Sequence, residues 1–185
     1  MRLNWLPNAI TIARVVLTLP LLWLLAKNDF RWAFWVAVAA GLSDGVDGYL
    51  ARRYAWSSAL GGVLDPIADK LLVSVGYIGL WWSGHLPGWL VALVFVRDVV
   101  IVLGGCAWWR LNGTFEAAPS FLGKCSTALQ ITLVACVLAD LAVQPLPAGL
   151  LRWLSLATAL LTLVSGLDYV IRYGQRARSA LGERK

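Results

Sequence analysis

Six long apolar runs dominate this chain of 185 residues. They cover about residues 8–26, 32–52, 61–82, 88–110, 121–142 and 148–173. As a helix rising 1.5 Å per residue, each run is long enough to cross a hydrocarbon layer of roughly 30 Å. The sequence therefore predicts an all-α, integral membrane bundle of six transmembrane helices.

The composition agrees with a membrane protein and leaves room for one domain. Hydrophobic residues make up 59% of the chain and charged residues 14%, against about 45–50% and about 25% in ordinary soluble domains. Six spanning helices with short connections use nearly the whole chain, so we expect a single transmembrane domain over residues 1–185. Any chemistry then happens in or at the membrane, with membrane lipids as partners and no nucleic acid.

The distribution of basic residues predicts the orientation of the helices. Most Lys and Arg residues fall on one side of the expected topology, namely Arg2, Arg52, Arg53, Arg110, Lys124, Arg172, Arg176, Arg178, Arg184 and Lys185. The other side has Lys27, Arg31 and Arg152. Because basic residues concentrate on the cytoplasmic side, we expect both termini there, in a multi-pass protein of the cell inner (cytoplasmic) membrane. The basic tail either attracts anionic lipid, at about 1 kcal/mol per residue, or only fixes the topology.

Four aspartates lie where apolar helices are expected. The second run contains DGVD at 44–47, and the third contains DPIAD at 65–69. A carboxylate near the middle of a spanning helix costs about 2.5–3.5 kcal/mol, so such residues normally face a cavity or a partner. Spacings of three and four residues put each pair on one face of its helix. A short cytoplasmic connection can then bring both pairs together.

Bound metal is the simplest explanation for this acidic cluster. Clustered carboxylates repel one another in a low dielectric unless a cation lies between them, and hard ions such as Mg²⁺ or Mn²⁺ select oxygen ligands. The alternatives are a proton pathway or ion pairs with nearby basic residues, namely Arg52, Arg53 and Lys70. Neither alternative explains the small residues Gly48, Ala51 and Gly61, which leave space for a nucleotide.

The motif as a whole resembles the signature of a known family. The pattern D-x2-D-G-x2-A-R-x8-G-x3-D-x3-D is similar to that of the CDP-alcohol phosphotransferase family. Its fixed positions are occupied by Asp44, Asp47, Gly48, Ala51, Arg52, Gly61, Asp65 and Asp69. Weaker matches at 7–14, 97–98, 123–130 and 165–169 are similar to the branch of phosphatidylglycerophosphate synthases and CMP-forming cardiolipin synthases. The resemblance thus extends over most of the chain.

The resemblance implies a reaction and a set of roles. The family displaces CMP from a CDP-linked lipid, such as CDP-diacylglycerol, by attack of an alcohol hydroxyl on the lipid-side phosphorus. It implies a six-helix bundle, usually a homodimer, with two divalent cations, Mg²⁺ or Mn²⁺, in an active site facing the cytoplasm. By position, the metal ligands are Asp44, Asp47, Asp65 and Asp69, with Asp69 also the general base. The CDP site is expected at Gly48, Ala51, Arg52 and Gly61.

Three further basic residues lie in or at the ends of apolar helices. Arg14, Arg97 and Lys124 are candidates for binding the acceptor or the lipid phosphate. The alternative is simple ion pairing, either with Asp98 or with the acidic cluster. Both possibilities stay open at this point.

The acceptor alcohol must be inferred from departures from the family patterns. The resemblance leaves two glycerol-type acceptors: phosphatidylglycerol, which gives cardiolipin, and glycerol 3-phosphate, which gives phosphatidylglycerophosphate. Phosphatidylglycerophosphate synthases typically have two further basic residues, where this chain has Gly105 and Ser126. Arg97-Asp98 and Lys124 with Ser126 are closer to the cardiolipin synthase pattern. We therefore favour phosphatidylglycerol and keep glycerol 3-phosphate as the alternative.

Two other classes of protein, a transporter or channel and a scaffold protein, are alternatives to the enzyme. A transporter or channel lined by the acids predicts flux without CMP release. A scaffold protein recruited to anionic lipid by its basic tail predicts that Asp65→Asn and Asp69→Asn leave function intact.

Overall fold

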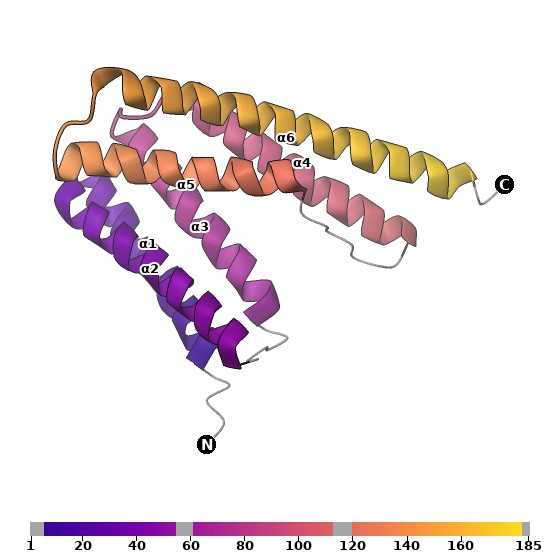
Figure 1. Ribbon diagram of the computed structural model, residues 1–185, viewed down its shortest axis with the longest axis horizontal. Helices are drawn as coiled ribbons and strands as arrows, with labels where there is room; N and C mark the ends of the chain where they lie inside the picture. The colour runs from indigo at the N-terminus through magenta and orange to yellow at the C-terminus, as the bar shows by residue number, and fades with distance from the viewer. Residues whose placement is uncertain (1–5, 55–60, 113–119, 183–185) are drawn as a thin grey trace. The chain divides into compact units, whose positions relative to one another are not determined.

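The computed structural model describes the backbone of residues 6–54, 61–112 and 120–182. Side chains within residues 6–11, 44–54, 61–67, 106–112, 148, 173 and 176–182 are not described. The described backbone forms six α-helices and no strand (Figure 1): α1 (Leu6–Ala26), α2 (Phe30–Tyr54), α3 (Gly61–Trp82), α4 (Gly88–Asn112), α5 (Phe121–Ala142) and α6 (Ala148–Gly182). For this part of the chain the all-α prediction is confirmed.

Three of these helices are long and apolar enough to cross a membrane. Within the described residues, the qualifying stretches are Gly88–Gly105 in α4, Phe121–Ala142 in α5 and Gly149–Arg172 in α6. In α1 and α2 the described side chains cover only the apolar stretches Ile12–Ala26 and Phe30–Ser43. Three of the six runs are thus candidate membrane spans by length and composition.

Two connections between helices contain a residue in the left-handed conformation. Asn28 and Gly84 have positive φ angles, 58° and 81°. The amide nitrogen of Asp29 donates to the carbonyl oxygen of Leu24 at 2.9 Å, a bond that closes a helix end when the preceding residue is left-handed. Glycine and asparagine tolerate this conformation better than most residues do.

The helix ends differ most from the prediction at α6. The apolar run ends near residue 173, but the helix continues to Gly182. Hydropathy reports the length of a membrane span, whereas helix formation also continues through polar residues such as those that follow Arg172. The other boundaries agree with the prediction to within two residues.

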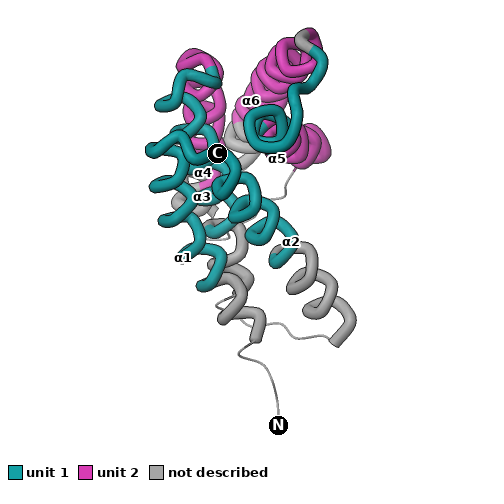
Figure 2. Tube along the Cα trace, turned by 90° about the vertical axis from the view of Figure 1, so that its left-hand side faces the viewer, with its two compact units in different colours: residues 1–86, 134–147 teal, residues 87–133, 148–185 magenta. Residues whose placement is uncertain are grey.

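The chain divides into two compact units (Figure 2). Unit 1 comprises residues 1–86 and 134–147, and unit 2 comprises residues 87–133 and 148–185. Helix α5 contributes its first part to unit 2 and its second part to unit 1. The single-domain assignment for residues 1–185 stays a prediction.

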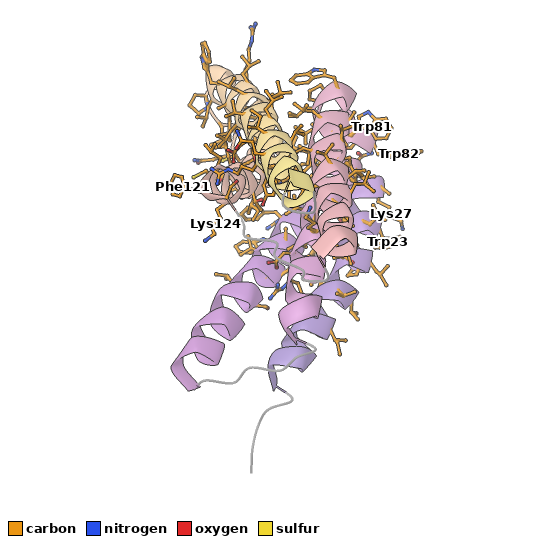
Figure 3. The ribbon with its side chains drawn as sticks, turned by 90° about the vertical axis from the view of Figure 1, so that its right-hand side faces the viewer. Trp23, Lys27, Trp81, Trp82, Phe121 and Lys124 are labelled. Carbon is orange, nitrogen blue, oxygen red and sulfur yellow. The ribbon has the colours of Figure 1, made fainter. Side chains whose placement is uncertain are left out.

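In unit 1, helix α1 packs against both α2 and α3. Its buried residues recur at helical spacing, namely Arg14, Thr18, Leu21 and Leu25. A Cβ atom added at Gly79 of α3 would lie 2.8 Å from the Cβ atom of Leu25. The two helices approach closely there because residue 79 has no side chain. At the end of α1, the Lys27 ammonium lies 3.9 Å from the centre of the Trp23 ring (Figure 3).

In unit 2, helices α4 and α6 pack side by side. The buried apolar residues of α4 include Leu90, Val91 and Val94. The buried residues of α6 are largely polar, namely Thr158, Thr162, Ser165 and Tyr169, with Ala159 beside them. This polar face is unusual for a membrane helix and holds much of the candidate site of this unit.

Candidate functional site

The acidic motif lies on two helices of unit 1. Asp44 and Asp47 belong to α2, and Asp65 and Asp69 belong to α3. Because both segments are helical, spacings of three and four residues place each pair on a common face. Asp69 alone of the four has a described side chain. The helical setting of the motif is therefore established, and the carboxylates of Asp44, Asp47 and Asp65 lie outside the described side chains.

The residues expected to bind CDP occupy the same two helices. Gly48, Ala51 and Arg52 lie in α2, and Gly61 is the first residue of α3. Their side chains also fall outside the described set. Their role in nucleotide binding stays a prediction.

Asp69 is joined to α1 by an ion pair. The Nη1 atom of Arg14 donates to the Oδ1 atom of Asp69. The Arg14 side chain is 0% exposed, whereas the Asp69 side chain is 47% exposed. The sequence predicted that Arg14 contacts the acceptor or lipid phosphate or pairs with the acidic cluster. In the structure it pairs with Asp69 of the acidic motif.

Metal binding is not decided by the described side chains. Within that set, no group of three or more His, Cys, Asp and Glu residues could hold a metal ion. The same set contains only Asp69 of the four motif acids. The ligand assignment therefore stays a prediction based on the spacing and chemistry of the four carboxylates.

Arg97 is the centre of a polar contact in unit 2. Its Nη1 atom donates to Oδ1 of Asp98 at 2.9 Å, and its Nη2 atom donates to Oγ of Ser165 at 3.0 Å. A longer bond of 3.4 Å joins Nη2 to the carbonyl oxygen of Gly123. Arg97 is 7% exposed, so one buried guanidinium connects α4, α5 and α6. The ion pair with Asp98, which the sequence left as an alternative, is present.

Small residues make room for the Arg97 side chain. A Cβ atom added at Gly123 would lie 3.2 Å from Nη2 of Arg97 and 3.3 Å from the ring of Tyr169. One added at Gly166 would lie 3.6 Å from Cγ of Arg97. Gly123 also lies in the first turn of α5, where its amide nitrogen donates to Oγ of Ser120 at 3.0 Å, as in a standard N-cap.

A second polar cluster, the α5–α6 hydroxyl cluster, consists of Ser126, Gln130 and Thr162. The Oγ atoms of Ser126 and Thr162 lie 3.3 Å apart, and Nε2 of Gln130 donates to Oγ1 of Thr162 at 3.2 Å. All three side chains are buried. Sequence reasoning noticed Ser126 and Gln130 only as motif positions and missed Thr162. The available signal was the recurrence of hydroxyl residues at 158, 162 and 165 in a leucine-rich run.

Lys124 is exposed near the beginning of α5. It follows Gly123, whose carbonyl oxygen accepts from Arg97. Figure 3 shows Lys124 and the exposed Phe121 pointing away from the helix. Lys124 is therefore accessible to an anionic ligand, whereas Arg97 is enclosed by protein.

Asp168 lies one turn beyond Ser165 on α6. Its Oδ1 atom accepts from Nε of Arg172 at 2.7 Å. Within the described part of the chain, its buried Oδ2 atom and the buried Nε atom of Arg97 have no hydrogen-bond partner. Unit 2 therefore contains one buried hydrogen-bond donor and one buried acceptor that the described contacts do not use.

Comparison with known proteins gives one family. Residues 4–164 match the family described as CDP-alcohol phosphatidyltransferase. A cardiolipin synthase (CMP-forming) of Rattus norvegicus is 32% identical over 92% of this chain and 62% of its own length. One of Streptomyces coelicolor is 35% identical over 68% of this chain and 61% of its own length. A probable phosphatidylglycerophosphate synthase of Mycobacterium tuberculosis is 32% identical over 92% of this chain and 82% of its own length. The matched region spans about three fifths of the two cardiolipin synthases.

Proposed function

Because this chain belongs to the CDP-alcohol phosphatidyltransferase family, we propose that it transfers a phosphatidyl group from CDP-diacylglycerol to a glycerol-type alcohol. The acceptor oxygen bonds to the lipid-side phosphorus, the bond from this phosphorus to the oxygen bridging the diphosphate breaks, and CMP leaves. The acceptor hydroxyl gives its proton to Asp69. The observation that carries this proposal is the complete acidic motif, from Asp44 to Asp69, on helices α2 and α3.

Asp69 has the exposure that a general base needs. A base must come within hydrogen-bond reach of the hydroxyl, about 2.6–3.2 Å. The Asp69 side chain is 47% exposed, so a hydroxyl can approach it. Arg14, on the other side of the ion pair, is fully buried.

The donor set of the motif fits divalent cations. Asp44, Asp47, Asp65 and Asp69 offer oxygen ligands only, which Mg²⁺ and Mn²⁺ prefer. We propose that these four residues hold two such ions. When bound, the ions supply charge neutralisation at the diphosphate and at the departing CMP.

The nucleotide is proposed to lie over the small residues of the motif. Gly48, Ala51 and Gly61 present little bulk beside the acids. Arg52 offers a planar guanidinium that can bind a phosphate through two hydrogen bonds. These residues bind and orient CDP, while Asp69 handles the proton.

Phosphatidylglycerol is the acceptor that the described contacts favour. Its phosphodiester carries less negative charge than the phosphate monoester of glycerol 3-phosphate, and the charge of Arg97 is already balanced by Asp98 at 2.9 Å. Ser126, where a second lysine would serve a monoester, is 0% exposed and hydrogen-bonded within the bundle. Lys124 is accessible for binding the single charge of a diester. Glycerol 3-phosphate is the alternative acceptor, because relatives named for either product have similar identities to this chain.

We also propose a membrane topology and an oligomeric state. Six helices span the inner (cytoplasmic) membrane, with both termini and the active site on the cytoplasmic side, where basic residues concentrate. The protein acts as a homodimer, as the family resemblance implies. Three of the six spans are supported by helix length and apolar character.

The experiment is a two-acceptor assay with the purified full chain. Protein in mixed micelles receives CDP-diacylglycerol, Mg²⁺ or Mn²⁺, and either phosphatidylglycerol or glycerol 3-phosphate; CMP release and the lipid product are measured. Cardiolipin formed with phosphatidylglycerol alone supports the proposal in full. Product formed with glycerol 3-phosphate alone would make glycerol 3-phosphate the acceptor. If neither acceptor gives metal-dependent CMP release, the proposed enzyme activity is contradicted.

A further inference from the structure

Arg14 is a buried cation next to an exposed carboxylate. Its side chain is 0% exposed, and Asp69, which it contacts through Oδ1, is 47% exposed. Within this pair the two residues face different surroundings: Arg14 is enclosed by protein, and Asp69 reaches the surface. A side chain without exposed area cannot touch a lipid phosphate unless the helices around it move.

Close packing between α1 and α3 holds the helix that carries Arg14 in place. Arg14 and Leu25 are the first and last members of the buried row on α1 that also contains Thr18 and Leu21. Leu25 packs directly on Gly79 of α3. A Cβ atom added at Gly79 would lie 2.8 Å from the Cβ atom of Leu25. Close packing of this kind fixes the position of one helix against its neighbour. This contact holds α1, which carries Arg14, against α3, which carries Asp69.

The chemistry of the pair allows Asp69 to work while Arg14 holds it. A buried guanidinium needs a charged or polar partner, because removing its hydration is costly. A carboxylate has two oxygens with about four lone-pair positions. A hydrogen bond from Arg14 to Oδ1 therefore does not exhaust the acceptor capacity of Asp69 for a metal ion or a hydroxyl proton.

We infer that Arg14 is a positioning residue for Asp69, and that it does not bind the substrate phosphate. It supports the carboxylate from the buried side and fixes the orientation of the exposed side. This inference rests on the proposed function, since it assigns Asp69 to metal and proton chemistry. It changes the role predicted for Arg14 from the sequence, where contact with the acceptor or lipid phosphate was expected.

The test uses two variants of Arg14 and a matched control. Arg14→Met removes the charge with little change in length, and Arg14→Lys keeps the charge but loses the planar fork. Thr18→Val is the control, because Thr18 lies one turn along the same buried row, and its Oγ1 atom donates only to the local carbonyl oxygen of Val15, at 2.6 Å. Two readouts are measured: Mn²⁺ binding without substrate, by the electron paramagnetic resonance signal of free Mn²⁺, and kcat and KM for CDP-diacylglycerol.

A positioning role predicts a specific pattern. Arg14→Met weakens Mn²⁺ binding and lowers kcat by about 10–100-fold each, the usual effect of losing a residue that orients a metal ligand, and KM for CDP-diacylglycerol changes less than about threefold. Arg14→Lys shows the same pattern with a smaller loss, and Thr18→Val resembles the wild type. If Arg14→Met does not fold, the pattern in Arg14→Lys decides. A tenfold or larger rise in KM with unchanged kcat and Mn²⁺ binding would assign Arg14 to the substrate and overturn the inference, as would wild-type behaviour of Arg14→Lys.

A double-variant cycle separates this inference from the proposed function. If Arg14 acts through Asp69, then Asp69→Asn combined with Arg14→Met binds Mn²⁺ no more weakly than Asp69→Asn alone. If the two losses multiply, Arg14 acts elsewhere and the inference is wrong. Should the wild type bind Mn²⁺ but release no CMP with any acceptor, the proposed function fails while the Mn²⁺ measurements still decide the role of Arg14.

Discussion

Helices α1 and α6 bury residues at the same spacing but of different chemistry. Counted from the first buried residue, both rows recur at positions 0, 4, 7 and 11 of the helix. In α1 of unit 1 the row is Arg14, Thr18, Leu21 and Leu25. In α6 of unit 2 the row is Thr158, Thr162, Ser165 and Tyr169. One spacing therefore serves a row of two leucines, one threonine and one arginine in unit 1, and a row of four hydroxyl-bearing residues in unit 2.

The difference indicates how each unit uses its polar groups. In unit 1, the charge of the buried row is confined to Arg14, which pairs with a partly exposed acid of the motif. In unit 2, the hydroxyls of α6 bond to buried groups of α4 and α5. We therefore expect substitutions of charged groups in unit 1 to change the chemistry, and substitutions in the polar row of unit 2 to change stability first.

The largest effect is expected for Asp69→Asn in unit 1. The amide cannot accept the hydroxyl proton, and general bases contribute about 10²–10⁴-fold to rates. The rate of CMP release should fall by about 100-fold or more, and the thermal unfolding midpoint should fall less than for Arg97→Met, because the amide oxygen at residue 69 can still accept from Arg14. A variant that keeps more than a tenth of the wild-type rate would show that Asp69 is not the base. It would also contradict the expectation that charged groups of unit 1 act in the chemistry.

Arg97→Met should have the largest effect on stability in unit 2. Arg97 is buried and bonds to Asp98 and Ser165; removing one partner of a buried ion pair costs about 3–5 kcal/mol. The thermal unfolding midpoint in detergent measures this loss. Lys124→Met is the control, since Lys124 is exposed, and it should leave the midpoint unchanged while raising KM for the acceptor. Equal midpoints for the two variants would break the distinction between buried and exposed cations.

Gly79→Ala should destabilise the apolar contact of unit 1. The new methyl group would meet Leu25, whose Cβ atom lies 2.8 Å from the added position, and overpacking of this kind costs about 1–3 kcal/mol. Gly41→Ala on α2 is the matched control, because no atom lies within 4 Å of its added Cβ. There the better helix propensity of alanine should be neutral or stabilise by up to about 1 kcal/mol. If both variants behave alike, close packing at Gly79 does not hold α1 against α3.

The smallest effect is expected in the α5–α6 hydroxyl cluster. Thr162→Val removes a hydroxyl that lies 3.3 Å from Ser126 and 3.2 Å from Gln130, and side-chain hydrogen bonds between membrane helices average about 0.6 kcal/mol, with a maximum of about 1.7. Thr132→Val is the control, because Thr132 is exposed and bonds only to its own helix, at 2.8 Å to Ala128. The free energy of unfolding should fall for Thr162→Val and stay unchanged for Thr132→Val. A loss as large as that of Arg97→Met would show that the hydroxyls, rather than the guanidinium, hold unit 2 together.

The sequence predicted the helices well because apolar length is a local property. Turns at Asn28 and Gly84 were also predictable, since both residue types tolerate positive φ angles. The end of α6 was predicted too early because the helix continues past its apolar run to Gly182. Local patterns thus predicted the helices and most of their ends, and failed at the end of α6, where the helix continues through polar residues.

The partners of the buried cations were harder to predict. Arg14 and Arg97 were recognisable from sequence as unusual residues in apolar helices, but their contacts depend on which helix lies opposite. Asp69 is 55 positions from Arg14, and Ser165 is 68 positions from Arg97. Thr162 was missed for the same reason: a hydroxyl in a helix has no distinctive pattern until Ser126 and Gln130 lie against it.

The most direct test of the central claim is metal-dependent release of CMP by the wild-type chain. Purified protein in vesicles of CDP-diacylglycerol and phosphatidylglycerol is stripped of metal with a chelator, and CMP is measured before and after Mn²⁺ is restored. A metal-dependent phosphatidyltransferase gives no release in the stripped sample, release proportional to protein after Mn²⁺ is added, and one cardiolipin per CMP. Release that does not depend on the metal, or no release with Mn²⁺ present, would contradict the claim.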